Sequence, residues 1–113
     1  MSISGNYGTF LPGLMKAVEK TNGDVLELGM GMFSTPYLHY QCLLANRQLT
    51  SYDNDQNWAQ FFIDYGYQQP HHHIVVVDDY AKANIDKWWD VVLIDHSPDF
   101  RRVIEARRLA NLA

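Results

Sequence analysis

Apolar and polar residues follow two patterns along the chain: short apolar runs, and longer stretches with helical spacing. Apolar runs that end in polar residues predict four β-strands, at residues 24–28, 49–52, 74–77 and 89–95. Helical spacing predicts helices before the first strand, between the first three strands, and from about residue 99 to residue 112. Strands that alternate with helices are typical of βαβ units, so we expect an α/β domain with a mostly parallel sheet.

The helix predicted between the second and third strands has the clearest pattern. Its aromatic residues fall at positions i, i+3, i+4 and i+7, namely Trp58, Phe61, Phe62 and Tyr65. This spacing predicts a stripe that packs into the core. Asp55 before the helix and Gly66 after it are residue types that commonly cap the two ends of a helix.

The first strand leads directly into a turn with two glycines and then into a helix. Gly29 and Gly31 lack a Cβ atom, so the backbone can turn sharply there and a ligand can lie against it. Ser34 or Thr35 is predicted as the N-cap, with Pro36 at the first helical position. Such a strand–turn–helix unit brings ligands to a helix N-terminus. The alternative is a turn that only packs the strand against the helix.

Carboxylates stand within the first strand and at the end of the second. Glu27 interrupts the apolar run, where its burial is costly unless it meets hydrogen-bond donors. Asp53 ends the second strand, at the separation from Gly29 that a βαβ unit requires. An acidic residue at this place accepts hydrogen bonds from ribose hydroxyls in dinucleotide-binding units. The alternative is that Asp53 and Asp55 only cap the next helix.

Polar residues also end the third and fourth strands. Asp78, Asp79 and Tyr80 follow the third strand, and the short segment 81–87 follows them. A carboxylate there can accept from the exocyclic amine of an adenine, and a ring can complete the pocket; the alternative is a cap for segment 81–87. The fourth strand ends at Asp95 and His96, which in a doubly wound sheet point toward the glycine turn.

The strand ends together carry a combination of motifs: Glu27-x-Gly29-x-Gly31, Asp53, Asp78-Asp79 and Asp95-His96. Over residues 5–110 this combination resembles the cofactor-binding half of the class I S-adenosyl-L-methionine (SAM)-dependent methyltransferases. The stretch Val-Val-Leu-Ile-Asp-His is similar to the catechol-type O-methyltransferases. The resemblance implies a Rossmann-like three-layer α/β/α fold with strand order 3-2-1-4, ending after the helix that follows the fourth strand.

The resemblance also implies roles for individual residues, with SAM as the cofactor. Glu27 and the turn from Gly29 to Gly31 would approach its methionine part, together with Ser34. Asp53 would hold the ribose, and the adenine would lie by Asp78, Asp79 and Tyr80. His96 would flank the cofactor, and Asp95 and His96 are the candidate catalytic residues. Asp95 matches one magnesium ligand of the catechol type, but the other ligands come from beyond the fourth strand, so no metal is expected.

Composition narrows the classes of function. The 113 residues suit one domain over the whole chain, and the net charge of −4 argues against a nucleic-acid partner. No apolar run approaches the roughly 18 residues of a membrane span. One cysteine, Cys42, excludes an internal disulfide, and no secretory signal is visible, so we expect a cytoplasmic protein.

Two clusters of basic residues have alternative interpretations. His71, His72 and His73 point in alternate directions if extended, so they cannot all bind one metal ion. Four arginines fall on the helix predicted from residue 99 to residue 112, namely Arg101, Arg102, Arg107 and Arg108. They form either a solvated helix face or a small basic patch for an anionic partner.

The leading hypothesis is a SAM-dependent methyltransferase that acts on a small-molecule substrate. The alternative is a non-catalytic or truncated SAM- or nucleoside-binding module, because a full class I sheet has three more strands. Cleavage of SAM without an acceptor stays open, whereas Ser34 replaces the third glycine of a nicotinamide-dinucleotide motif. A chain that ended after the last helix would expose the fourth strand as an apolar edge, which predicts a homo-oligomer.

Overall fold

The computed structural model describes residues 12–79, 82–83, 87–97 and 100–104, and of 95–97 and 100–104 it describes the backbone. A helical stretch at 12–20 comes first. The elements that follow are β1 (Val25–Leu28), α2 (Ser34–Ala45), β2 (Leu49–Asp53), α3 (Gln56–Asp64), β3 (His72–Val76), β4 (Val91–Ser97) and β5 (Phe100–Ile104). Each of the four predicted strands forms, with its ends shifted by no more than two residues.

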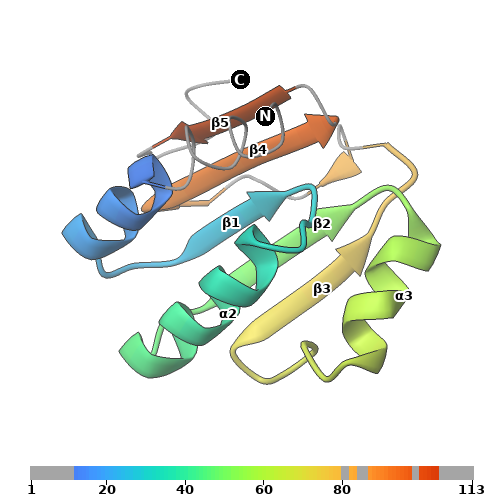
Figure 1. Ribbon diagram of the computed structural model, residues 1–113, viewed down its shortest axis with the longest axis horizontal. Helices are drawn as coiled ribbons and strands as arrows, with labels where there is room; N and C mark the ends of the chain where they lie inside the picture. Colours follow the sequence, from blue (N-terminus) through green and yellow to red (C-terminus); the bar gives the residue numbers. More distant parts are fainter. Residues whose placement is uncertain (1–11, 80–81, 84–86, 98–99, 105–113) are drawn as a thin grey trace.

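The strands form one sheet in the order β3-β2-β1-β4-β5, of which the first four are parallel (Figure 1). The predicted order 3-2-1-4 is therefore confirmed, and the arrangement is compatible with a Rossmann-like fold. Since β2 and β3 extend to one side of β1 and β4 lies on the other, the winding reverses at β1. Ligands of open α/β sheets bind outside the carboxyl ends of the strands at such a switch point.

The predicted helix from residue 99 to residue 112 is wrong over residues 100–104, which form β5. This strand pairs antiparallel with β4, with Val92 opposite Ile104 and Leu93 opposite Val103. The β-branched residues Val103 and Ile104 suit a strand, and β4 offers them a hydrogen-bonding edge that no local pattern reveals. Residues 105–112, with Arg107 and Arg108, lie outside the described part of the chain.

β5 also changes the premise of the predicted homo-oligomer. That prediction depended on β4 forming an exposed edge, and β5 covers the edge of β4. The described residues therefore give no reason to require a second copy of the chain.

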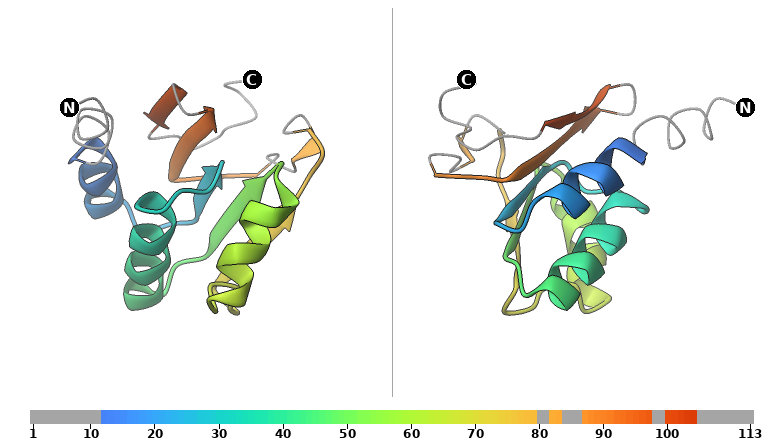
Figure 2. Two further views of the ribbon diagram at one scale, coloured as in Figure 1. Left: turned by 45° about the vertical axis from the view of Figure 1, so that its right-hand side comes forward. Right: turned by 90° about the vertical axis from the view of Figure 1, so that its left-hand side faces the viewer.

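The helical stretch 12–20, α2 and α3 cover one face of the sheet (Figure 2). One cluster of fully buried residues joins the sheet to the first two helices: Leu14, Val25, Leu38, Cys42, Leu49, Val91 and Leu93. Under α3, Phe62 packs with Met30, Ala59 and Ile74, so the predicted aromatic stripe does reach the core. Tyr65, at the end of that stripe, is exposed.

The opposite face of the sheet is covered by the connection from β3 to β4. Trp89 and Ala83 of this connection pack on Leu26, Tyr52 and Val92. A right-handed crossover from β3 to β4 has to pass over this face, because β4 lies on the far side of β1. No α-helix covers this face in the described ranges, so the second helical layer of the predicted three-layer fold is not seen there.

A buried arginine ties the first helix to the sheet. Arg47 is 3% exposed, and its guanidinium donates to the carbonyl groups of Gly23 and Val18 and to the hydroxyl of Thr21. The carboxylate of Asp90, just before β4, accepts from the Gly23 backbone N–H at 2.8 Å. The segment between the first helix and β1 is therefore held from both sides.

Candidate functional site

The glycine turn lies at the carboxyl end of β1 and is held by its neighbours. Gly29 has φ 98°, a left-handed conformation that favours glycine, and its N–H donates to the carbonyl of Tyr52 at 2.8 Å. At the tip of the turn, the Met30 N–H donates to Asp53 Oδ2 at 2.8 Å, and Trp58 Nε1 donates to the Met30 carbonyl at 2.9 Å. The turn is thus fixed to β2 and to α3.

The start of α2 differs from the predicted cap. The helix begins at Ser34, its N-cap is Phe33 with no side-chain cap hydrogen bond, and Pro36 is the third helical residue. Thr35 Oγ1 instead accepts from the Gly31 N–H at 2.9 Å. The hydroxyl groups of Ser34 and Thr35 both donate to Glu27, which draws them toward the sheet and away from the cap position.

Glu27 is completely buried and accepts hydrogen bonds from the hydroxyl groups of Ser34, Thr35 and Ser51. Ser34 and Ser51 donate at 2.7 Å, and Thr35 donates at 3.0 Å to the same oxygen as Ser34. Glu27 therefore meets the donors that its burial requires, inside the protein. It lies beneath α2, where it positions the first turn of the helix and the end of the glycine turn.

Asp53 is 4% exposed and connects two loops. Its Oδ2 atom accepts from Met30 N–H, and its Oδ1 atom accepts from Asp55 N–H at 2.9 Å. Asp55 caps α3 by accepting from the Trp58 N–H at 3.1 Å, as predicted. A ribose hydroxyl that reached Asp53 would share its carboxylate with two backbone donors.

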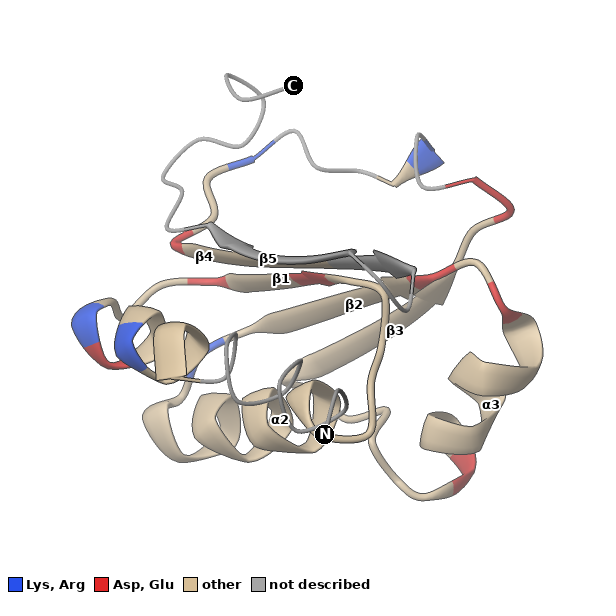
Figure 3. Cartoon of the chain, turned by 45° about the horizontal axis from the view of Figure 1, so that its top comes forward, with Lys and Arg blue, Asp and Glu red and all other residues tan. Residues whose placement is uncertain are grey.

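The residues after β3 are exposed. Asp78 forms an ion pair with Lys82 at 3.0 Å, and the Asp79 carbonyl accepts from the Lys82 N–H. Figure 3 shows acidic segments at this end of the sheet, near the start of α3 and in the connection after β3. Tyr80, the third residue predicted for this place, lies outside the described residues.

Asp95 and His96 lie in the last part of β4, beside the glycine turn. The parallel register pairs Leu28 with Ile94, so Asp95 follows at the level of Gly29. The structure describes the backbone of these two residues. It brings the two candidate catalytic residues and the turn to the same edge of the sheet, as the strand order requires.

A second polar group runs through the core and was not predicted from the sequence. Ser51 Oγ lies 2.9 Å from His72 Nε2, and His72 Nδ1 lies 2.8 Å from His39 Nδ1. With Glu27 these residues form a continuous chain of hydrogen bonds between the sheet and α2. Polar residues at inward-facing strand positions were the available signal, because Glu27, Ser51 and His72 all stand where an apolar side chain is expected.

Burial governs the protonation of the two histidines. It lowers the pKa of His72 to about 3, with a further lowering from His39, His71 and His73. The pKa of His39 is also lowered, first by burial and then by His71. His72 and His73 point in opposite directions, as predicted, since His72 is fully buried and His73 is exposed. The ring of His71 does not alternate with that of His72, because both lie against His39, with ring centroids 4.6 Å and 5.1 Å from it.

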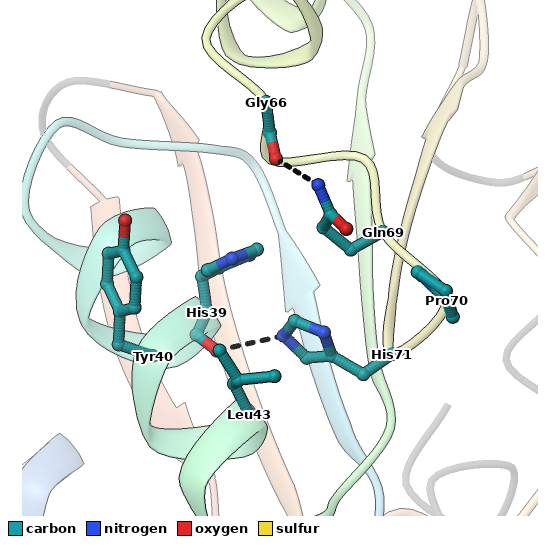
Figure 4. Close-up of a pocket in the computed structure, with 7 residues that line it drawn as sticks. All are labelled: His39, Tyr40, Leu43, Gly66, Gln69, Pro70 and His71. Atoms are coloured by element: carbon teal, nitrogen blue, oxygen red, sulfur yellow. Dashed lines mark hydrogen bonds between the residues drawn. The ribbon is translucent and has the colours of Figure 1, made fainter.

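The hydrogen-bonded chain ends at a pocket of about 410 Å³ between α2 and the segment 66–71. Its lining residues are His39, Tyr40, Leu43, Gly66, Gln69, Pro70 and His71 (Figure 4). This pocket lies by the amino end of β3, so it is distinct from the carboxyl edge where the glycine turn lies.

Comparison with known proteins gives no match to a family model, to a curated protein or to a solved structure. In the described ranges, no helix has the length and apolar character needed to cross a membrane.

Proposed function

We propose that the chain binds SAM at the carboxyl edge between β1 and β4 and transfers its methyl group to a small molecule. The observation that carries the proposal is the place of Gly29. This glycine adopts φ 98° at the switch point of a parallel sheet, beside the candidate catalytic residues of β4. A sharp turn without a Cβ atom at that point lets a ligand approach the backbone closely.

Under this proposal, some candidate residues contact the cofactor directly and others act indirectly. Gly29 and Gly31 would contact the cofactor through their backbone, while the buried Glu27 would act indirectly, through its hydrogen bonds to Ser34 and Thr35. The exposed carboxylates after β3 are accessible to the amine of an adenine. SAM supplies an activated methyl group, so the protein mainly has to orient the two reactants.

A second candidate function is binding of SAM or a related nucleoside without catalysis. The observation that favours it is that both Asp53 oxygens already accept backbone hydrogen bonds, and that Glu27 is fully buried. Both carboxylates then act in holding the loops.

Calorimetric titration with SAM, S-adenosylhomocysteine and NAD in parallel tests the proposal. We expect the two sulfur nucleosides to bind and NAD not to bind. Absence of binding by SAM and S-adenosylhomocysteine would overturn both candidate functions. Where SAM binds, Asp95→Asn separates the two functions: under the methyltransferase proposal it abolishes turnover of an acceptor and leaves SAM affinity unchanged.

A further inference from the structure

The pocket by His39 lies at the end of a hydrogen-bonded chain whose direction is set at its other end. The Ser51 hydroxyl donates its proton to Glu27 Oε1 at 2.7 Å. The Ser51 oxygen is then the acceptor for His72 Nε2–H at 2.9 Å. A neutral His72 with its proton on Nε2 has a lone pair on Nδ1, so it accepts from His39 Nδ1–H at 2.8 Å.

This order leaves the Nε2 atom of His39 as an acceptor. The His39 side chain projects from α2 toward the segment 66–71 and lines the pocket (Figure 4). His39 is 5% exposed, and its Nε2 atom has no hydrogen-bond partner within the described part of the chain. The donors of the chain all point toward Glu27, which polarises each bond and increases the electron density at the far end.

Two other side chains of the pocket also donate to backbone carbonyl groups. His71 Nε2 donates to the His39 carbonyl at 2.9 Å, so Nδ1 is the one ring nitrogen of His71 that can accept a hydrogen bond. The Gln69 amide group donates one N–H to the Gly66 carbonyl at 2.8 Å, and its oxygen is an acceptor. The pocket therefore offers acceptor atoms from three side chains.

We infer that this pocket binds a small organic cation with N–H donors on an apolar body, such as a primary ammonium compound. Its N–H groups would meet the acceptor atoms of His39, His71 and Gln69. Tyr40, whose ring lines the pocket, supplies an aromatic face that attracts a cation. The net charge of −4 favours the approach of a cation.

A divalent metal ion is the main competing ligand, because imidazole lone pairs bind metals well. Metal sites in proteins commonly have three or more protein ligands. Among the described residues, no group of three histidine, cysteine, aspartate or glutamate side chains is placed to hold one. The organic cation is therefore favoured. A chelator in every titration removes free metal ions, so that the binding measured is that of the organic cation.

The tautomers of the histidines can be measured directly on the unmodified protein. Long-range proton–nitrogen NMR correlation of the imidazole rings at neutral pH should show the proton on Nδ1 of His39 and on Nε2 of His72 and His71. A neutral His39 with its proton on Nε2 would make the pocket end of the chain a donor, and the inference would be wrong. This measurement needs no variant and does not depend on SAM binding.

Binding is tested with three probes of similar size. The NMR shifts of the His39 and His71 rings report the binding of each probe. Benzylammonium has charge and N–H donors, benzyltrimethylammonium has charge alone, and benzyl alcohol has neither the charge nor an N–H group. We expect benzylammonium to bind about tenfold or more tightly than the other two, as a charge-assisted hydrogen bond provides. Equal binding of all three, or no binding of benzylammonium, would overturn the inference.

Two substitutions complete the test. His39→Phe should weaken benzylammonium binding by about tenfold or more, because it removes the acceptor and keeps a ring in place. His73→Phe is the matched control. His73 follows His72 on β3, but it is exposed, faces away from the pocket and bonds to Gln48. If His39→Phe unfolds the protein, His71→Phe serves in its place. Unchanged binding in the folded His39 or His71 variant would contradict the inference.

Discussion

The Nδ1 atoms of His39 and His72 lie 2.8 Å apart in the core, between α2 and β3. One ring has to donate and the other has to accept, so the two histidines cannot both carry a proton on these atoms. The pair joins α2 to a strand two places away from β1, and its partner Ser51 joins both to Glu27. This link gives the first testable consequence for stability.

Ser51→Ala should destabilise the protein strongly. The substitution removes one donor from Glu27 and leaves His72 Nε2 without its acceptor, and both groups are fully buried. We expect the free energy of unfolding in urea to fall by about 2–4 kcal/mol. Thr50→Ala is the control on the same strand, because Thr50 faces the other side of the sheet; it should cost about 1 kcal/mol or less. Equal losses in the two variants would contradict a role for the Ser51 hydroxyl.

Stability should fall as the pH is lowered from 7.5 to 5.0. Burial lowers the pKa of His72 to about 3 and also lowers that of His39, whereas in the unfolded chain both titrate near about 6.5. The unfolded state therefore takes up protons first as the pH falls. The contribution of the neutral rings to stability is complete above about pH 6.5 and is lost below it, by up to about 1.4 kcal/mol per pH unit for His72, and His39 acts in the same direction.

Urea unfolding at each pH measures this slope, above the range where exposed carboxylates titrate. His72→Gln should flatten the profile, whereas His73→Gln, on the exposed side of β3, should keep most of the slope. A wild-type profile that is flat between pH 7.5 and 5.0 would show that these rings are not held neutral.

Gly29→Ala should abolish cofactor binding under the proposed function. Both Gly29 and Gly66 have positive φ values, 98° and 88°, so alanine at either costs about 1–2 kcal/mol of stability. Gly66 follows α3 by the other pocket, and a Cβ atom there meets nothing within 4 Å. Calorimetry should therefore show lost SAM binding for Gly29→Ala and unchanged binding for Gly66→Ala. Equal effects on binding would place the cofactor elsewhere.

Asp53→Asn should loosen the two loops at the carboxyl edge. An asparagine keeps one acceptor oxygen but turns an amide group toward the second backbone N–H, so either Met30 or Asp55 loses its partner. We expect a loss of about 1–3 kcal/mol in thermal or urea unfolding. Asp78→Asn is the control, since its ion pair with Lys82 is exposed and contributes little. No difference between the two variants would argue against the bracing role of Asp53.

Local patterns predicted much of the fold. The apolar runs marked the four parallel strands, and Asp55 and Gly66 marked the two ends of α3 correctly. These features depend on residues close together in the sequence, where hydrophobic periodicity and cap chemistry act. The glycine turn was found for the same reason, because the positive φ of Gly29 is a local demand of the backbone.

The predictions that failed depended on contacts between distant segments. Residues 100–104 have helical spacing but pair with β4, whose edge they cover. Ser34 and Thr35 are suitable caps by residue type, but they donate to Glu27 seven and eight positions away. In both cases a tertiary partner outcompeted the local preference, since propensity and cap energies are only about 1 kcal/mol.

The sequence by itself therefore determined the alternation of strands and helices and the place of the glycine turn, and the resemblance of its motifs implied the order of the first four strands. Only the tertiary structure decided that β5 closes the edge of β4, that Asp53 holds two loops, and that Glu27 connects through Ser51 and His72 to His39. The physical reason is the range of the interactions. A buried polar group takes whichever partner the packed core brings to it, and that partner is fixed only when the whole sheet has formed.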